Sequence, residues 1–132
     1  MTTLSTTRTD SLMRLAMRAD AVLTGLAGLA VLPIAGWVAD LCGTSLAIEY
    51  SMAAFFIGYG LVVFGLAALP SVRRAGIAVI AANILYSLAA VAVVVSDVWT
   101  MTAAGVAVTL ATGVYTAAFA AVQYRGVRRL AS

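Results

Sequence analysis

The sequence predicts an all-α membrane protein in which four transmembrane helices form an up-down bundle with the N- and C-termini in the cytoplasm. Two observations lead to this prediction. Hydrophobic residues make up 64% of the 132 residues and charged residues only 10%, whereas a soluble domain carries roughly 25% charge. The apolar residues also run in tracts of about 20, the length that crosses a bilayer as a helix.

Short polar connections separate the tracts, and together they make one transmembrane domain of residues 1–132. A polar, Arg-bearing stretch precedes the first span, and Pro33 near the end of that span predicts a kink. Pro70 marks the turn between the second and third spans. The four spans are expected at about residues 19–38, 50–69, 75–95 and 101–124.

The basic residues predict the orientation. All eight are Arg, and they lie before the first span, in the middle turn and after the last span. With four crossings these places share one side of the membrane, whereas the opposite side holds Asp40, Glu49 and Asp97. Positive residues in short loops stay in the cytoplasm, so both termini are expected on the inner side of a bacterial inner membrane. The expected cytoplasmic anchors are Arg14, Arg18, Arg73, Arg74, Arg125, Arg128 and Arg129.

The residues that the chain lacks exclude several chemistries. There is no His and one cysteine, Cys42, so imidazole ligands, cysteine clusters and an intrachain disulfide are all missing. The sequence also has no Ser-His or Cys-His pair and no glycine-rich phosphate loop. We therefore expect no enzymatic activity, no metal and no cofactor. The Arg residues flank membrane-length tracts, so membrane lipids rather than nucleic acid are the expected partners.

An ionisable side chain in the middle of a membrane signals function, because it costs at least about 2.5 kcal/mol there. The sequence predicts none at that depth. Asp20 comes closest, about one turn inside the inner boundary, and is expected to anchor the helix at the interface, near water and Arg side chains. A role in binding a coupling ion is the alternative. Gln123 is expected to form hydrogen bonds at the same boundary.

Two kinds of helix face are predicted within the spans. Polar residues can form interhelical hydrogen bonds or line a site for a small ligand, and small residues allow close helix contacts inside the bundle or with a partner. The candidate polar stripe is Asn83, Ser87, Thr109, Thr112 and Thr116. The candidate packing residues are Ala54, Gly58, Gly65, Gly113 and Ala117.

Two short motifs carry a resemblance. They are Asn83-Ile84-Leu85-Tyr86 in the third span and the tail Gln123-Tyr124-Arg125-Gly126-Val127-Arg128-Arg129. With the Arg-rich lead-in, residues 12–130 resemble a group of small, uncharacterised four-helix integral inner-membrane proteins of bacteria. This resemblance implies a fold and a location but no activity.

The small multidrug resistance transporters also have four short helices in a chain of similar length. Their function depends on a Glu in the middle of the first helix, where this sequence has only Asp20 near the edge. This difference argues against proton-coupled export.

These features predict a non-catalytic accessory, assembly or stabilising subunit of a membrane complex, which packs against other membrane chains or against itself. The alternative is a small oligomeric transporter or channel that uses the polar stripe of the third and fourth helices. The transporter hypothesis requires Asn83 and its neighbours to face a cavity.

Overall fold

The computed structural model describes residues 2–130, with side chains from residue 10 onward, and nearly all of this part is helical. The elements are α1 (Thr2–Val31), the 3₁₀ turn η1 (Leu32–Ile34), α2 (Ala35–Cys42), α3 (Leu46–Leu66), α4 (Arg73–Ser96) and α5 (Ala103–Arg128). Within residues 2–130, four helical segments are long and apolar enough to cross a membrane, the first running from Asp10 through α2 to Cys42. The four predicted membrane-length helices are confirmed, and by length and composition the chain is a multi-pass membrane protein.

Local capping explains where two helices begin. The Ser45 hydroxyl accepts a hydrogen bond from the backbone N–H of Ile48 at 3.2 Å, so α3 starts at residue 46 rather than 50. The Thr102 hydroxyl caps α5 in the same way, accepting from the N–H of Gly105 at 3.1 Å. This helix then continues to residue 128, past the expected end at 124.

The first helix begins before the expected span. The polar lead-in continues into the first span as one helix from Thr2, whereas the span was expected to begin at about residue 19. Pro33 interrupts the helix near its far end, as predicted, because proline lacks the N–H that an α-helix needs. The interruption takes the form of the 3₁₀ turn η1.

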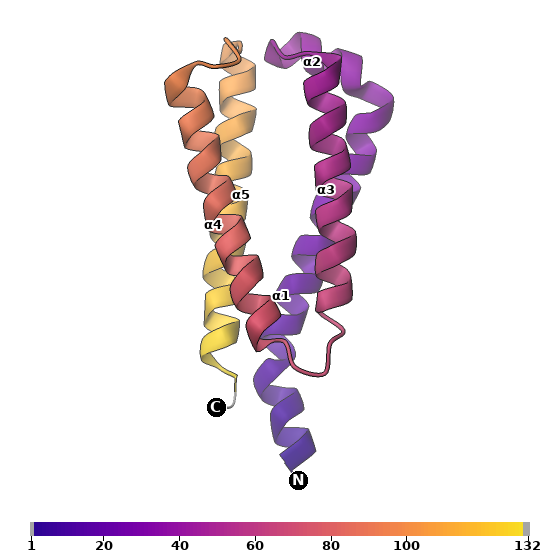
Figure 1. The fold of residues 1–132 in the computed structure, drawn as a ribbon, viewed down its shortest axis with the longest axis vertical. Helices are drawn as coiled ribbons and strands as arrows, with labels where there is room; N and C mark the ends of the chain where they lie inside the picture. Colours follow the sequence, from indigo (N-terminus) through magenta and orange to yellow (C-terminus); the bar gives the residue numbers. More distant parts are fainter. Residues whose placement is uncertain (1, 131–132) are drawn as a thin grey trace.

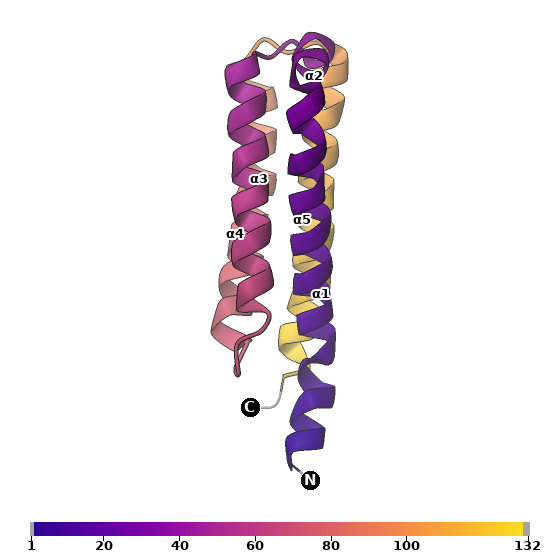
Figure 2. The ribbon, with the colours of Figure 1, turned by 90° about the vertical axis from the view of Figure 1, so that its right-hand side faces the viewer.

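The helices pair as two hairpins, α1 with α3 and α4 with α5, and α1 joins the hairpins by packing along α5. In both views the start of α1, the end of α5 and the 67–72 connection lie at one end, which we call the Arg end (Figures 1 and 2). The connections at 43–45 and 97–102 lie at the opposite end, the far end. Figure 1 shows α3 and α4 diverging from the Arg end toward the far end.

The buried apolar core belongs mainly to the Arg end. Its buried members are Met13, Met17, Ala21, Val63, Ala67, Val72, Val79 and Val127. Glycines bring α1 and α3 close together: a Cβ on Gly60 would lie 2.6 Å from the Ala21 carbonyl oxygen, and one on Gly28 would lie 2.7 Å from that of Ala53. Lipid supplies no hydrophobic drive between helices, so such close contacts hold this hairpin together.

Candidate functional site

A buried carboxylate lies where the two hairpins meet. Asp20 on α1 is 0% exposed, and each of the other three long helices sends a polar side chain to its Oδ2 atom. The Tyr59 hydroxyl from α3 donates at 2.7 Å, the Asn83 amide from α4 at 3.0 Å and the Gln123 amide from α5 at 2.9 Å. Asn83 and Gln123 are themselves buried, and the Asn83 amide also donates to Gln123 Oε1 at 2.9 Å. One carboxylate thus links all four long helices.

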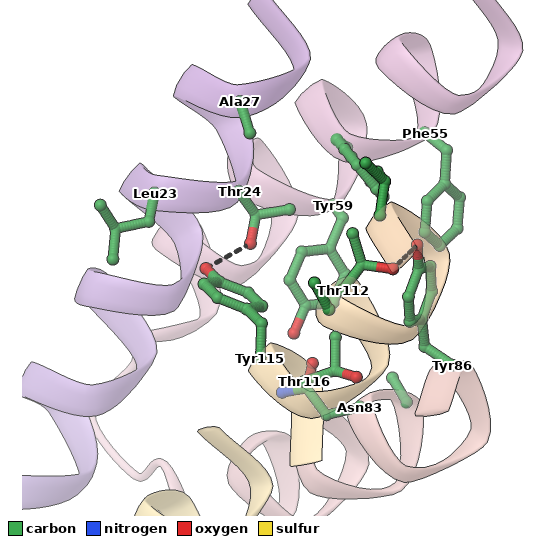
Figure 3. Close-up of a pocket in the computed structure, with 14 residues that line it drawn as sticks. Leu23, Thr24, Ala27, Phe55, Tyr59, Asn83, Tyr86, Thr112, Tyr115 and Thr116 are labelled. Carbon is green, nitrogen blue, oxygen red and sulfur yellow. Dashed lines mark hydrogen bonds between the residues drawn. The ribbon is translucent and has the colours of Figure 1, made fainter. Parts of the chain in front are cut away.

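The other carboxylate oxygen is also occupied. Asp20 Oδ1 accepts from the Thr24 hydroxyl at 3.1 Å and, more weakly, from the Tyr115 hydroxyl at 3.4 Å. The Thr24 and Tyr115 hydroxyls lie 2.9 Å apart and share a hydrogen bond (Figure 3). All of these groups can donate to Asp20, whose two oxygens are able to accept these bonds. Among the described residues no basic side chain pairs with Asp20.

Asp20 and Gln123 were expected to act at the interface, near water, but both side chains are 0% exposed inside the bundle. Asp20 lies six residues beyond Arg14 on α1, about 9 Å deeper along the helix axis. It also falls on the buried face that carries Met13 and Met17, so it points into the bundle rather than toward lipid or water. Gln123, 0% exposed, points inward from α5.

A cavity of about 320 Å³ lies immediately beyond this cluster, between the hairpins. Its walls are mainly apolar and aromatic, and its polar groups are few, which is the usual composition of a small-molecule site. The lining residues include Leu23 and Thr24 of α1, Phe55, Phe56 and Tyr59 of α3, Asn83 and Tyr86 of α4, and Thr112, Tyr115 and Thr116 of α5. Figure 3 shows Tyr59, Asn83 and Tyr115 among these residues. Because all three also hydrogen-bond Asp20, they separate the cavity from the carboxylate.

The cavity contains part of the predicted polar stripe. Asn83, Thr112 and Thr116 line it, and the Tyr86 hydroxyl donates to Thr112 at 3.2 Å. Ser87 instead joins α4 to α5, donating to the Gly113 carbonyl at 2.9 Å.

Thr109 does not join this group. Its hydroxyl contacts the Met101 sulfur at 3.4 Å, and it does not line the cavity.

The predicted packing residues divide between two environments. Gly113 is buried, and a Cβ there would lie 3.3 Å from Ala90 Cβ on α4. Gly58 and Gly65 lie on the exposed face of α3, where an added Cβ would meet no atom within 4 Å. The two candidate alanines, Ala54 and Ala117, are exposed as well.

Of the predicted Arg anchors, Arg14 makes specific contacts within the fold. Its guanidinium donates to the carbonyls of Ala67 at 2.8 Å, Leu69 at 2.6 Å and Pro70 at 3.1 Å, and it pairs with Asp10. Ala67 is the C-cap residue of α3 and the other two carbonyls lie in the connection that follows, so Arg14 holds the C-cap and this connection in place. The other six anchors are exposed: Arg18, Arg73, Arg74, Arg125, Arg128 and Arg129.

The fold and the cluster define a class, a multi-pass helical membrane protein with a buried carboxylate beneath a cavity. Comparison with known proteins takes the assignment no further, because no family model, no curated protein and no solved structure matches the chain.

Proposed function

We propose that the chain is a small carrier of the bacterial inner membrane that binds an apolar organic cation in the cavity between its hairpins. The observation that supports this is Asp20, a buried carboxylate with no basic partner among the described residues, lying directly beneath an aromatic cavity. A carboxylate in the membrane interior costs at least about 2.5 kcal/mol even on insertion scales. A protein that keeps one there without a cation of its own leaves a negative potential that a ligand can neutralise.

The cavity suits a cation with an apolar body. Tyr59, Tyr86 and Tyr115 line it, and aromatic rings attract cations. The Tyr59 hydroxyl lies 2.7 Å from Asp20 Oδ2, so a cation in van der Waals contact beyond it would lie about 6 Å from the carboxylate. At that distance, with an effective dielectric constant of about 20, the attraction is about 3 kcal/mol, or about 100-fold in affinity.

The location of the Arg residues supports an orientation with the Arg end in the cytoplasm. The Asp20 cluster and the buried core then close the cavity toward the cytoplasm. We expect a cysteine at Ser71, in a Cys42→Ser background, to react with a membrane-impermeant maleimide only after the cells are permeabilised. A cysteine at Val98 should react in intact cells, and the opposite pattern would reverse the orientation.

Binding of labelled phenyltrimethylammonium to the protein in lipid nanodiscs tests the proposed site. We expect saturable binding that Asp20→Asn weakens by about 30- to 100-fold and that the exposed-acid control Asp97→Asn leaves unchanged. The neutral molecule tert-butylbenzene has the same shape and should compete at least about tenfold less well. Equal binding by wild type and Asp20→Asn would refute a role for the carboxylate.

The accessory-subunit function stays a second proposal, supported by the exposed glycines of α3. Gly58 and Gly65 lie one above the other at a spacing of two helical turns, where a partner helix could approach closely. Native mass spectrometry of protein extracted gently from its own membranes tests this role. A co-purifying chain that is lost in Gly58→Leu, but retained in the exposed control Ala89→Leu, would support it; recovery of the wild-type chain alone would count against it.

A further inference from the structure

We propose that the cavity exchanges its ligand with the hydrocarbon of the bilayer through the seam between α3 and α4, so that the ligand is a membrane-dissolved cation with an apolar tail. This inference rests on the proposed function, because it specifies how the same site is reached and by which class of molecule. The observations that carry it concern the four seams between neighbouring helices and the base of the cavity.

Close backbone contacts seal the two seams inside the hairpins. Between α1 and α3, Gly28 and Gly60 leave no room for even a methyl group. Between α4 and α5, Gly113 packs on Ala90, and Ser87 Oγ lies 2.6 Å from Thr116 Oγ1. A ligand could pass through either seam only by separating helices that are in close contact.

The seam between α1 and α5 is held by contacts at three levels. At the Arg end a Cβ on Gly126 would lie 2.8 Å from Met13 Cα, and midway the hydroxyls of Thr24 and Tyr115 meet. At the far end the Thr102 N–H donates to the Cys42 carbonyl at 3.1 Å. The Asp20 cluster and the core close the base of the cavity.

The seam between α3 and α4 differs from the other three. At its base, Tyr59 of α3 and Asn83 of α4 meet at Asp20 Oδ2, and beyond them the two helices diverge toward the far end (Figure 1). Two aromatic rings, Phe56 of α3 and Tyr86 of α4, meet across it with centroids 6.0 Å apart and planes tilted by 54°. Phe55 beside them both lines the cavity and is 55% exposed, so the cavity wall continues onto the outer apolar surface.

Side-chain rotation can widen such a seam, whereas Gly28 and Gly60 hold α1 and α3 in close backbone contact. Rotamer changes of surface side chains are fast, on the order of picoseconds to nanoseconds. The surface outside the seam lies within membrane-length helices, so a molecule that crosses it comes from lipid. Its charged group would reach the tyrosines above Asp20 while its apolar tail stays between α3 and α4.

Competition between two cations in nanodiscs tests this route. The probe is labelled phenyltrimethylammonium, and the competitor is benzyldimethylhexadecylammonium, whose long tail remains in the bilayer. We expect the tailed cation to displace the probe from the wild-type protein. Displacement should weaken at least about tenfold in Ala82→Trp, because Ala82 lines the cavity one turn from Tyr86 and a large ring there fills the seam.

The matched control is Ala81→Trp, which adds the same ring to an exposed position beside the seam and should behave like wild type. The tailed cation adds positive charge to the membrane surface, which repels the probe whatever the protein. Both variants are measured in the same membrane, so this unspecific effect is the same for both. If Ala82→Trp itself loses the probe, Ala82→Leu takes its place in the comparison.

The outcomes separate the two proposals. Binding of the probe without displacement by the tailed cation, or equal displacement in the Ala82 and Ala81 variants, would overturn the lateral route and leave the cation site standing. Failure of both cations to bind the wild-type protein would overturn the proposed function and the route together.

Discussion

Replacing Asp20 tests whether one carboxylate holds the two hairpins together. In Asp20→Ala, the Tyr59 hydroxyl and the Gln123 amide lose the acceptor that they now reach at 2.7 and 2.9 Å, whereas the Asn83 amide keeps its bond to Gln123 Oε1. Each buried donor left without an acceptor costs about 1 to 3 kcal/mol. The expected loss in the free energy of unfolding is therefore about 2 to 6 kcal/mol.

Asp20→Asn separates geometry from charge. The asparagine oxygen can take the place of Oδ2, and its amide can donate to the Thr24 and Tyr115 hydroxyl oxygens, which are able to accept. The expected loss of stability is then about 1 kcal/mol or less, although the same variant should lose most of its affinity for a cation.

Reversible unfolding in mixed micelles, followed by circular dichroism as the mole fraction of dodecyl sulfate rises, measures both variants. The exposed-acid control Asp40→Ala should unfold like wild type. A loss below about 0.5 kcal/mol in Asp20→Ala, within the range of ordinary surface substitutions, would refute the linking role. Equal losses in Asp20→Ala and Asp20→Asn would refute the assignment of the donors.

Two further predictions concern packing and capping. Gly60→Ala should destabilise the protein by about 1 to 3 kcal/mol because its methyl group meets the α1 backbone. Gly58→Ala, on the open face of the same helix, should stabilise it by about 0.5 to 1 kcal/mol through helix propensity. The same unfolding assay checks both variants, and a similar loss of stability in the two would contradict the packing of α1 on α3. Arg14→Gln should lower the free energy of unfolding by about 1 to 3 kcal/mol because the carbonyls after α3 lose a charged donor. Arg18→Gln, at an exposed position, should change it little. Faster hydrogen exchange at the end of α3 in the Arg14 variant alone would confirm the cap, and equal exchange in both variants would contradict it.

The membrane helices were predictable because their signal is local. A run of apolar residues of membrane length gives a helix whatever surrounds it, and Pro33 and Pro70 mark interruptions through their own backbone chemistry. The exact helix ends were less predictable, since they depend on single hydroxyls such as those of Ser45 and Thr102.

The site was harder to predict because it depends on which way each helix faces. Asp20 and Gln123 are 103 positions apart in the sequence. Their distance from the helix ends gives their position along each helix, but not the side to which their side chains point. A usable signal was present nonetheless: Asp20 and Thr24 are one turn apart on a stripe that continues back through Met13 and Met17. Every polar group within lipid needs a partner, so the inward polar residues of α3, α4 and α5 were the candidates to pair with that stripe.

The measurement that tests the central claim most directly is a crystal structure of the protein with 4-bromophenyltrimethylammonium, located by the anomalous scattering of bromine. We expect the bromine peak inside the cavity lined by Phe56, Tyr86 and Thr112, with the ammonium group turned toward Tyr59 and Asp20. A peak confined to the outer helix faces, in crystals grown at a saturating concentration of the probe, would contradict a cation site above the buried carboxylate.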